Sequence, residues 1–366
     1  MRSSKLVVYS AIASAIVVLT LTGERSAAAL EIKLRFDSGF AAYPDAQFAI
    51  AAAAHRWEAV LADPMEVAID IRLSNELDFF TGAETSVVEG LLPYVELRDA
   101  LAADVTTSDD AAATAQLQPG PFLSFRTLAP DRSLIVSAGS DVINEYAVLS
   151  SANAKALGFD VGQLESDGEI WFNQVLLDFH NFDVDPTNGV QGFDLTGVAT
   201  HEMAHILGFN SGVDTLDLVF HTGPIPPDLA AGLPTPEEIN EYSVLEALDL
   251  FRYSAASAGL IDMTPGADAF FSLDGGASAI AAFATGTLNG DGSQAGHWRG
   301  GSGILDAVLD VGTAYQITAI DLRALDVIGW DRRAVPEPAT LMMLLVAATS
   351  VSTRRRRAAW EFPTTR

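Results

Sequence analysis

The stretch GVATHEMAHILGFNSG, residues 197–212, decides what the chain is expected to build. It contains the pattern His-Glu-x-x-His at His201, Glu202 and His205. Residues four positions apart share one face of a helix, so both imidazoles can bind one zinc ion, at about 2.0 to 2.1 Å. Glu202 lies beside them, where it can accept a proton from a water molecule that the metal activates. We predict a zinc-binding helix that ends at Gly208, with Glu202 as the catalytic general base.

Two histidines do not complete a catalytic zinc site, which usually has three protein ligands and a water. The motif resembles that of the metzincin metalloproteases, HExxHxxGxx followed by His or Asp, but Ser211 stands at the last position. In the leishmanolysin group of that class, an insertion follows the glycine and a later histidine stands in a His-Trp pair. This chain has Gly296-His297-Trp298, followed by GILDAV and ITAIDLRALDVIGW.

This resemblance implies an α+β, metzincin-like zinc protease domain with a small mixed sheet, and His297 as the third metal ligand. His221 and Asp214 are weaker alternative ligands. The methionine that metzincins place beneath the metal is replaced by Leu305, a residue of similar volume that packing should tolerate. From about Gly192 to Trp330 the chain also resembles a bacterial family of predicted metalloproteases that carry a PEP-CTERM sorting signal.

Both ends of the chain resemble export signals. Residues 1–29 have basic, apolar and small-residue segments in the order of a signal peptide, with cleavage expected after Ala29. Residues 336–366 contain Pro-Glu-Pro, a short apolar stretch and four arginines, and resemble the PEP-CTERM signal of Gram-negative bacteria, which is processed by an exosortase. The extra residues after the arginines depart from that pattern. We expect an extracellular or cell-surface protein that is transiently anchored in the membrane through its terminal segments alone.

Composition limits the other possibilities. With 366 residues, 49% of them apolar, the chain can bury a large core, and no linker divides residues 30–335, so one metalloprotease domain is expected there. The net charge of -27 argues against nucleic acid as a partner. Cysteine is absent, so a metal must be held by histidine and carboxylate side chains.

Several segments predict regular structure. Residues 46–62 are rich in alanine and suit a helix, and MEVAIDIRL (65–73) alternates as a strand with one buried face. EIWFNQV (169–175) is a second strand candidate, and we consider it as the edge strand along which a peptide substrate lies. Thr235-Pro236-Glu237-Glu238 predicts the start of a helix, and a last helix is expected from Thr318, with Asp321 as its capping partner.

The remaining candidates are weaker. His55 and His180 are interpreted as surface or packing residues. DVDPTNG (183–189) resembles a Ca²⁺ loop, but it lacks the closing glutamate of an EF-hand, so a solvated turn is favoured over Ca²⁺ binding.

The leading prediction is an exported zinc endopeptidase that acts on protein or peptide substrates. The alternatives are a noncatalytic cell-surface or matrix protein that retains the protease fold, and a hydrolase that acts on another substrate. Glu202 favours an enzyme, because a binding module does not need a base at that position.

Overall fold

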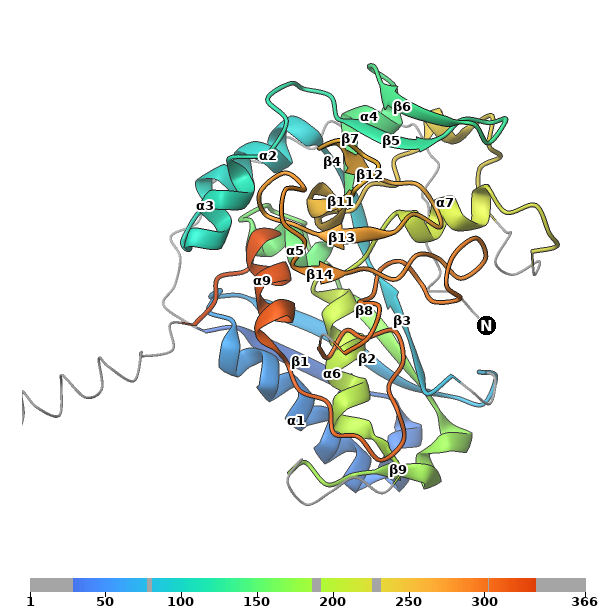
Figure 1. Ribbon diagram of the computed structural model, residues 1–366. Helices are drawn as coiled ribbons and strands as arrows, with labels where there is room; N and C mark the ends of the chain where they lie inside the picture. Colours follow the sequence, from blue (N-terminus) through green and yellow to red (C-terminus); the bar gives the residue numbers. More distant parts are fainter. Residues whose placement is uncertain (1–28, 78–80, 186–191, 226–231, 302, 334–366) are drawn as a thin grey trace, which may run out of the picture. The chain divides into compact units, whose positions relative to one another are not determined.

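A four-stranded sheet in the order β1-β2-β8-β3 supports the predicted metal-binding helix (Figure 1). The computed structural model describes residues 29–77, 81–185, 192–225, 232–301 and 303–333. The strands are β1 (Glu31–Phe36), β2 (Glu66–Ser74), β3 (Ala83–Val87) and β8 (Gly168–Asn173). The first two and β8 are parallel, whereas β3 runs antiparallel to β8. As the alternation predicts, β2 buries Val67, Ile69 and Ile71.

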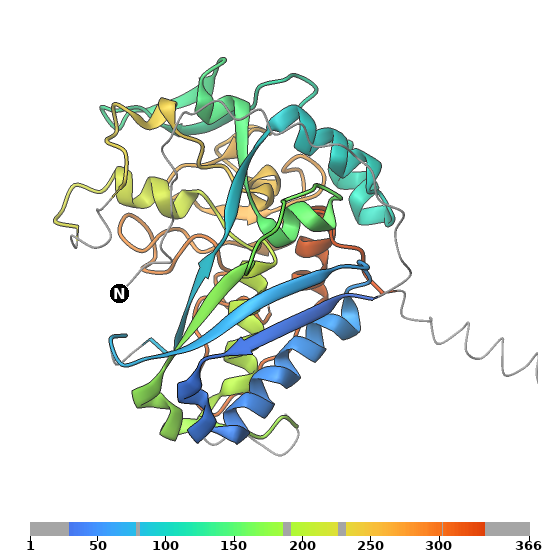
Figure 2. The same ribbon diagram turned by 180° about the vertical axis from the view of Figure 1, so that it is seen from behind.

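Two helices cover one face of this sheet, α1 (Pro44–Val60) and α6 (Leu195–Ile206) (Figure 2). The alanines of α1 are small enough to let α6 pack closely against it, and Ala46, Ala49 and Ala53 are fully buried. The indole Nε1 of Trp57 on α1 donates to the carbonyl of Thr200 on α6, at 2.9 Å. The helix expected over residues 46–62 is therefore confirmed, and it helps to fix the position of α6.

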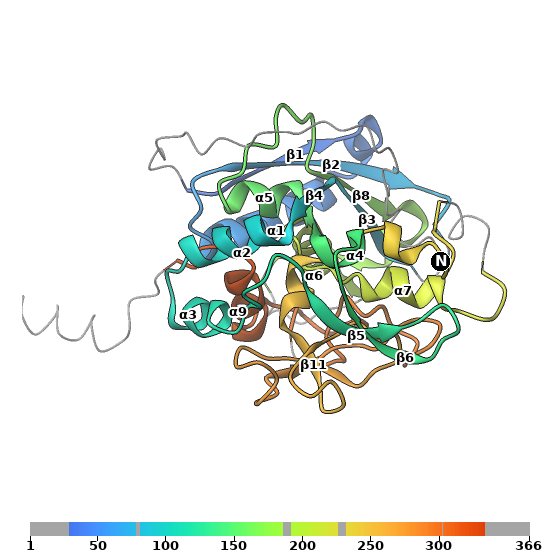
Figure 3. The ribbon, with the colours of Figure 1, turned by 90° about the horizontal axis from the view of Figure 1, so that it is seen from above.

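A six-stranded sheet in the order β14-β13-β11-β12-β5-β6 lies on the other side of α6 (Figure 3). Its strands β12 and β5 are parallel, and the other neighbours are antiparallel. The strands are β5 (Ser124–Leu128), β6 (Leu134–Ala138), β11 (Arg252–Ser254), β12 (Ile261–Asp262), β13 (Ala269–Phe271) and β14 (Ala281–Ala282). The described residues thus form an α+β structure, with several mixed sheets rather than one small one.

Shorter elements connect these layers. Two further sheets pair β4 (Glu89–Pro93) with β7 (Tyr146–Ser150) and β9 (His180–Asn181) with β10 (Phe193–Asp194). The other helices are α2 (Tyr94–Ala103), α3 (Ser108–Thr114), α4 (Val142–Glu145), α5 (Ser151–Ala156), α7 (Val213–Val219) and α9 (Ala319–Val327). The 3₁₀ helices are η1 (Ser38–Ala42), η2 (Gln174–Phe179), η4 (Ile239–Glu241) and η5 (Ala247–Phe251).

The assignment of residues 169–175 as an edge strand is wrong. Residues 169–173 lie in β8 and residues 174 and 175 begin η2; Ile170 and Phe172 are buried on one side as expected, but β8 lies between β2 and β3. The two edges of the sheet are β1 and β3, and the sequence of β3, AETSV, has only a weak apolar pattern. A strand's own sequence does not specify its neighbours, so the alternation could not distinguish the two positions.

The helix predicted from Thr235 is also wrong. The capping contact forms, since the backbone N–H and hydroxyl of Thr235 both donate to the Glu238 carboxylate, at 3.0 and 2.9 Å. Only turns and the short η4 follow. The chain then pairs with β7, where the Val148 N–H donates to the Leu245 carbonyl at 2.8 Å. Pairing with β7 therefore takes up the chain soon after Thr235, and no longer helix forms there.

The last predicted helix is confirmed as α9. Thr318 is its N-cap, and Asp321 completes the capping box. The three-residue spacing of Leu322, Leu325 and Ile328 predicts that all three face the core; Leu325 and Ile328 are fully buried, whereas Leu322 is half-buried.

Both terminal segments lie almost entirely outside the described residues. By its contacts the chain divides into Met1–Arg332 and Arg333–Arg366, and Arg333 alone is described in the second unit. Among the described residues, no helix has both the length and the apolar character needed to cross a membrane. The predictions of a signal peptide and a sorting signal are not tested by the structure.

Candidate metal centre

Helix α6 presents the His-Glu-x-x-His motif from a well-capped helix. The Asp194 side chain at the N-cap accepts from the Gly197 N–H at 2.9 Å. At the other end the backbone of Gly208 has φ of 104°, a conformation that favours glycine, so the helix ends where the sequence predicts. The indole of Trp330 donates to the nearby Leu207 carbonyl at 2.8 Å. These contacts fix the direction of α6 and of the side chains it carries.

His297 reaches α6 from the C-terminal part of the chain. Its backbone carbonyl accepts from the Ala284 N–H at 2.9 Å, and the next residue, Trp298, donates its N–H to Leu305 at 2.9 Å. The Trp298 indole is buried and stacks on Phe283, with ring centroids 4.9 Å apart. The two residues of the His-Trp pair therefore have different roles. Trp298 anchors the segment in the core, and His297 faces α6.

The three predicted ligands converge on one point. Their Nε2 atoms are separated by 3.0 Å between His201 and His297, and by 3.2 Å from His205 to each of the others. Three nitrogens that bind one tetrahedral zinc ion at about 2.0 to 2.1 Å would lie roughly 3.3 Å apart. His201 and His297 are buried, and His205 is half-buried. Among the described residues, this is the group of side chains that can hold a metal ion.

The outer ring nitrogens explain why a cation suits this centre. His201 Nδ1 lies 2.8 Å from the Ile304 carbonyl, and His205 Nδ1 lies 2.8 Å from the Phe209 carbonyl. A carbonyl only accepts, so each Nδ1 carries the proton, and each neutral ring turns a lone pair at Nε2 toward the common point. Lone pairs that face each other at this distance repel, whereas a cation between them binds both.

Burial favours the neutral form of the His205 and His297 rings. It lowers the pKa of His205 to about 3, and the pKa of His297 falls well below its usual value for the same reason. The neighbouring histidines lower both pKa values further. A neutral imidazole is the form that binds a metal, so the donor set fits a zinc ion at neutral pH.

Glu202 lies against the edge strand β3. The hydroxyl of Thr85 on β3 donates to Glu202 Oε2 at 2.6 Å. Removal from water raises the pKa of Glu202, while His201 and the Thr85 hydroxyl act to lower it. A carboxylate held by one donor, with its other oxygen available to accept a proton, has the arrangement that a general base requires.

Leu305 lies in the segment expected to pass beneath the metal. Its side chain is fully buried, and so is that of its neighbour Ile304, whose carbonyl accepts from His201. The same segment therefore orients one of the three histidines.

The structure does not bring the alternative ligands, Asp214 and His221, to this point. Ser211, which stands where the metzincin pattern has a ligand, donates its hydroxyl to Asp249 at 2.6 Å. The Asp214 carboxylate accepts backbone N–H groups from Ala295 and Gly296, at 2.6 and 2.9 Å. The ring of His221 is not in the convergent group.

The other weak candidates lie away from the centre. His55 is exposed and contacts Glu58 at 2.6 Å, which agrees with a surface role. His180 is buried against Phe193, with ring centroids 5.6 Å apart, which agrees with a packing role. Of the possible calcium loop, residues 186–189 lie outside the described part, so that interpretation is not tested.

Comparisons with protein-family models, curated proteins and solved structures found no match to this chain.

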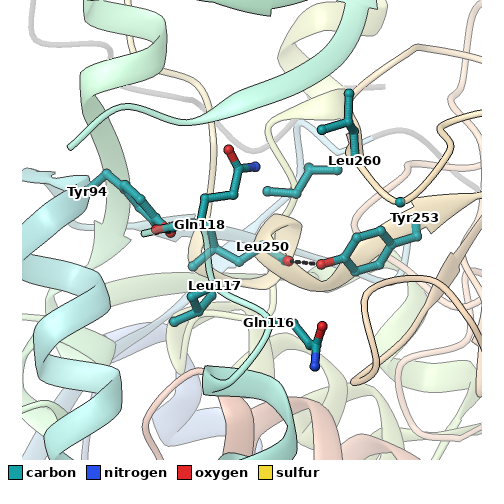
Figure 4. A pocket seen from close by; sticks show the side chains of 9 residues that line it. Tyr94, Gln116, Leu117, Gln118, Leu250, Tyr253 and Leu260 are labelled. Carbon is teal, nitrogen blue, oxygen red and sulfur yellow. Dashed lines mark hydrogen bonds between the residues drawn. The ribbon is translucent and has the colours of Figure 1, made fainter. Parts of the chain in front are cut away.

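A small cavity away from the metal centre has too little room for a peptide substrate. It has a volume of about 50 Å³ and is lined by Tyr94, Tyr253 and residues 116–118 (Figure 4). The Tyr253 hydroxyl donates to the Leu250 carbonyl at 3.3 Å, as drawn in Figure 4. Such a volume holds a few water molecules. The metal centre does not open into it, since no ligand lines it.

His180 gives a pH-dependent prediction. Its Nδ1 contacts the Leu176 carbonyl at 2.7 Å, and its buried Nε2 has no hydrogen-bond partner among the described residues. Burial lowers the pKa of His180 below its usual 6.5. Its contribution to stability is therefore complete above pH 6.5 and is lost as the pH falls, because only the unfolded chain takes up the proton. Between pH 7.5 and 5.5 it should account for up to about 1.4 kcal/mol of lost stability.

Urea unfolding of the wild type and of His180→Phe at the two pH values measures this contribution. The variant should lose less stability on acidification than the wild type. Equal losses in both proteins would show that His180 does not titrate in this range.

Proposed function

We propose that this chain is an exported zinc endopeptidase of the metzincin class, similar to the leishmanolysin group. The observation that carries the proposal is the convergence of three histidine Nε2 atoms within 3.2 Å of one another, next to Glu202. A distant third histidine followed by tryptophan is the arrangement that the resemblance implied. The fold agrees at the level of an α+β structure, and the assignment to the metzincin class is part of the proposal.

The residues divide the chemistry as follows. A zinc ion held by the three histidines would lower the pKa of a bound water and polarise the scissile carbonyl. Glu202 accepts the proton from the attacking water and passes it to the leaving amine. Thr85 holds one oxygen of Glu202, so the other is directed toward the reactants.

We propose that a peptide substrate binds along the edge of strand β3. This strand is one of the two terminal strands of its sheet, and no other described strand occupies its outer edge. A peptide in extended conformation can add to such an edge through main-chain hydrogen bonds. The contact between Thr85 and Glu202 places this edge directly beside the base. This adjacency supports a peptide rather than another hydrolysable substrate.

A noncatalytic surface protein is the second candidate. The acidic net charge of -27 and the resemblance of the C-terminal segment to a sorting signal suit it equally well. Glu202 weighs against it, because metal binding alone needs neither the base nor the threonine that orients it. Export, and processing of residues 336–366 by an exosortase, belong to the proposal on the strength of the terminal sequences.

Metal removal tests the proposal. The purified protein should contain about one zinc per chain and cleave casein or gelatin. A chelator should abolish cleavage, and one equivalent of Zn²⁺ should restore it. Cleavage that persists after complete removal of the metal would exclude a zinc mechanism, and stoichiometric zinc without cleavage of any protein substrate would favour the binding protein.

A further inference from the structure

We propose that Asp214 on α7 is a positioning residue for the third metal ligand, although it does not bind the metal itself. This inference rests on the proposed zinc site. It addresses how a histidine so far from His205 in the sequence is held at the correct distance from α6. The two ligands of α6 are fixed by one helix, whereas the third arrives on a separate segment.

The Asp214 carboxylate accepts hydrogen bonds from the two residues just before His297. One oxygen, Oδ1, accepts the Ala295 N–H at 2.6 Å, and Oδ2 accepts the Gly296 N–H at 2.9 Å. Two successive peptide groups held by one rigid carboxylate fix the direction in which the chain enters the next residue. The position of the His297 side chain follows from that direction.

The turn that carries Asp214 follows α6 and is itself held by η5. Asp249 accepts the Ser211 hydroxyl at 2.6 Å and the Gly212 N–H at 2.8 Å. Asp214 follows within this turn, at the start of α7. The turn between α6 and α7 is therefore held in place, and Asp214 links it to the segment that carries His297.

Gly296 lies in close contact with the same turn. A side-chain carbon at this position would be 3.1 Å from Asp214 Oδ2 and 3.2 Å from the Ser211 nitrogen. Both distances are shorter than ordinary van der Waals contacts. The glycine thus allows the segment to lie directly against the turn.

His297 depends on its backbone more than the other ligands do. His201 and His205 are each oriented by a carbonyl 2.8 Å from Nδ1. The Nδ1 atom of His297 makes no hydrogen bond of ordinary geometry among the described residues. The loss of the Asp214 contacts should therefore displace His297 in particular.

Asp217 supplies a matched control on the same helix. It too is buried, and its carboxylate accepts two successive N–H groups, from Leu288 at 2.7 Å and from Asn289 at 2.9 Å. Leu288 and Asn289 also precede His297 in the chain, but they are farther from it in the sequence than Ala295 and Gly296 are. Substitution there perturbs the fold in a similar way without touching the residues next to the ligand.

The experiment compares Asp214→Asn with Asp217→Asn in the full chain. Asparagine keeps the shape but presents an N–H group to a backbone N–H, so each variant loses one acceptor. Zn²⁺ affinity is measured by competition with a chelating indicator, and the Co²⁺-substituted protein reports ligand geometry through its visible spectrum. Asp214→Asn should weaken Zn²⁺ binding by about 10-fold to 100-fold, the usual effect of losing an outer-shell contact, and should alter the Co²⁺ spectrum. Asp217→Asn should change the affinity by less than about 3-fold.

Gly296→Ala provides a second variant if Asp214→Asn does not fold. It pushes the same segment from the turn and should also weaken Zn²⁺ binding. Equal weakening by Asp214→Asn and Asp217→Asn, or an unchanged affinity in Asp214→Asn with only a lower Tm of the metal-free protein, would show a purely structural role. A wild type that binds no Zn²⁺ would overturn the proposed function as well, so the two failures can be distinguished.

Discussion

The replacement of His297 by alanine should remove the metal and abolish peptide cleavage. The loss of one of three nitrogens that lie within 3.2 Å of one another leaves two ligands on α6 and opens the centre to water. Outer-shell contacts alone are worth roughly 10-fold to 100-fold in affinity, so the loss of a direct ligand should weaken Zn²⁺ binding by more than about 100-fold. Metal content after dialysis and casein cleavage measure the two effects.

His221→Ala is the control for this prediction. The ring of His221 lies outside the convergent group, so its removal should leave one zinc per chain and full cleavage. Trp298 anchors the segment independently of His297, and the Tm of the metal-free His297→Ala protein should therefore stay close to that of the metal-free wild type. If His297→Ala retained stoichiometric zinc, the centre would be closed by another residue, and the resemblance to the leishmanolysin group would be misleading.

The sequence predicted the parts of the site that one local pattern contains. The spacing of His201 and His205 requires a helix, and Gly208 marks its end, so α6 could be placed within a few residues. The third ligand could not come from spacing, because no periodicity links His297 to a helix so far away in the chain. The resemblance of Gly296-His297-Trp298 to a known pattern supplied it, and the structure brings the ring to α6.

The roles of Thr85 and Asp214, which lie next to the site, could not be predicted from the sequence. Thr85 stands in the segment AETSV, which carries no catalytic motif and only weak strand character. By sequence Asp214 is a weaker alternative ligand, but in the structure its carboxylate holds backbone N–H groups. In both cases the role depends on residues brought close by the tertiary fold. A single sequence gives no signal for such contacts.

The replacement of Glu202 by glutamine should separate metal binding from catalysis. Glutamine has nearly the same shape and can still accept the Thr85 hydrogen bond through its carbonyl oxygen, which Glu202 accepts at 2.6 Å. It cannot take up a proton at neutral pH, so the attacking water is no longer activated by a base. The value of kcat should fall by about 10²-fold to 10⁴-fold, the usual contribution of a general base, while zinc content stays at one per chain.

Glu237→Gln is the matched control, since Glu237 is exposed and the same change there should leave both kcat and zinc content unaltered. The two variants lose the same charge from a chain of net charge -27, so a general electrostatic effect on substrate association would appear in both. A loss of kcat confined to Glu202→Gln, with KM and metal content close to those of the wild type, would identify the carboxylate as the group that moves the proton. Full activity in that variant would mean that the water is activated in some other way, and the endopeptidase mechanism proposed for this centre would have to be abandoned.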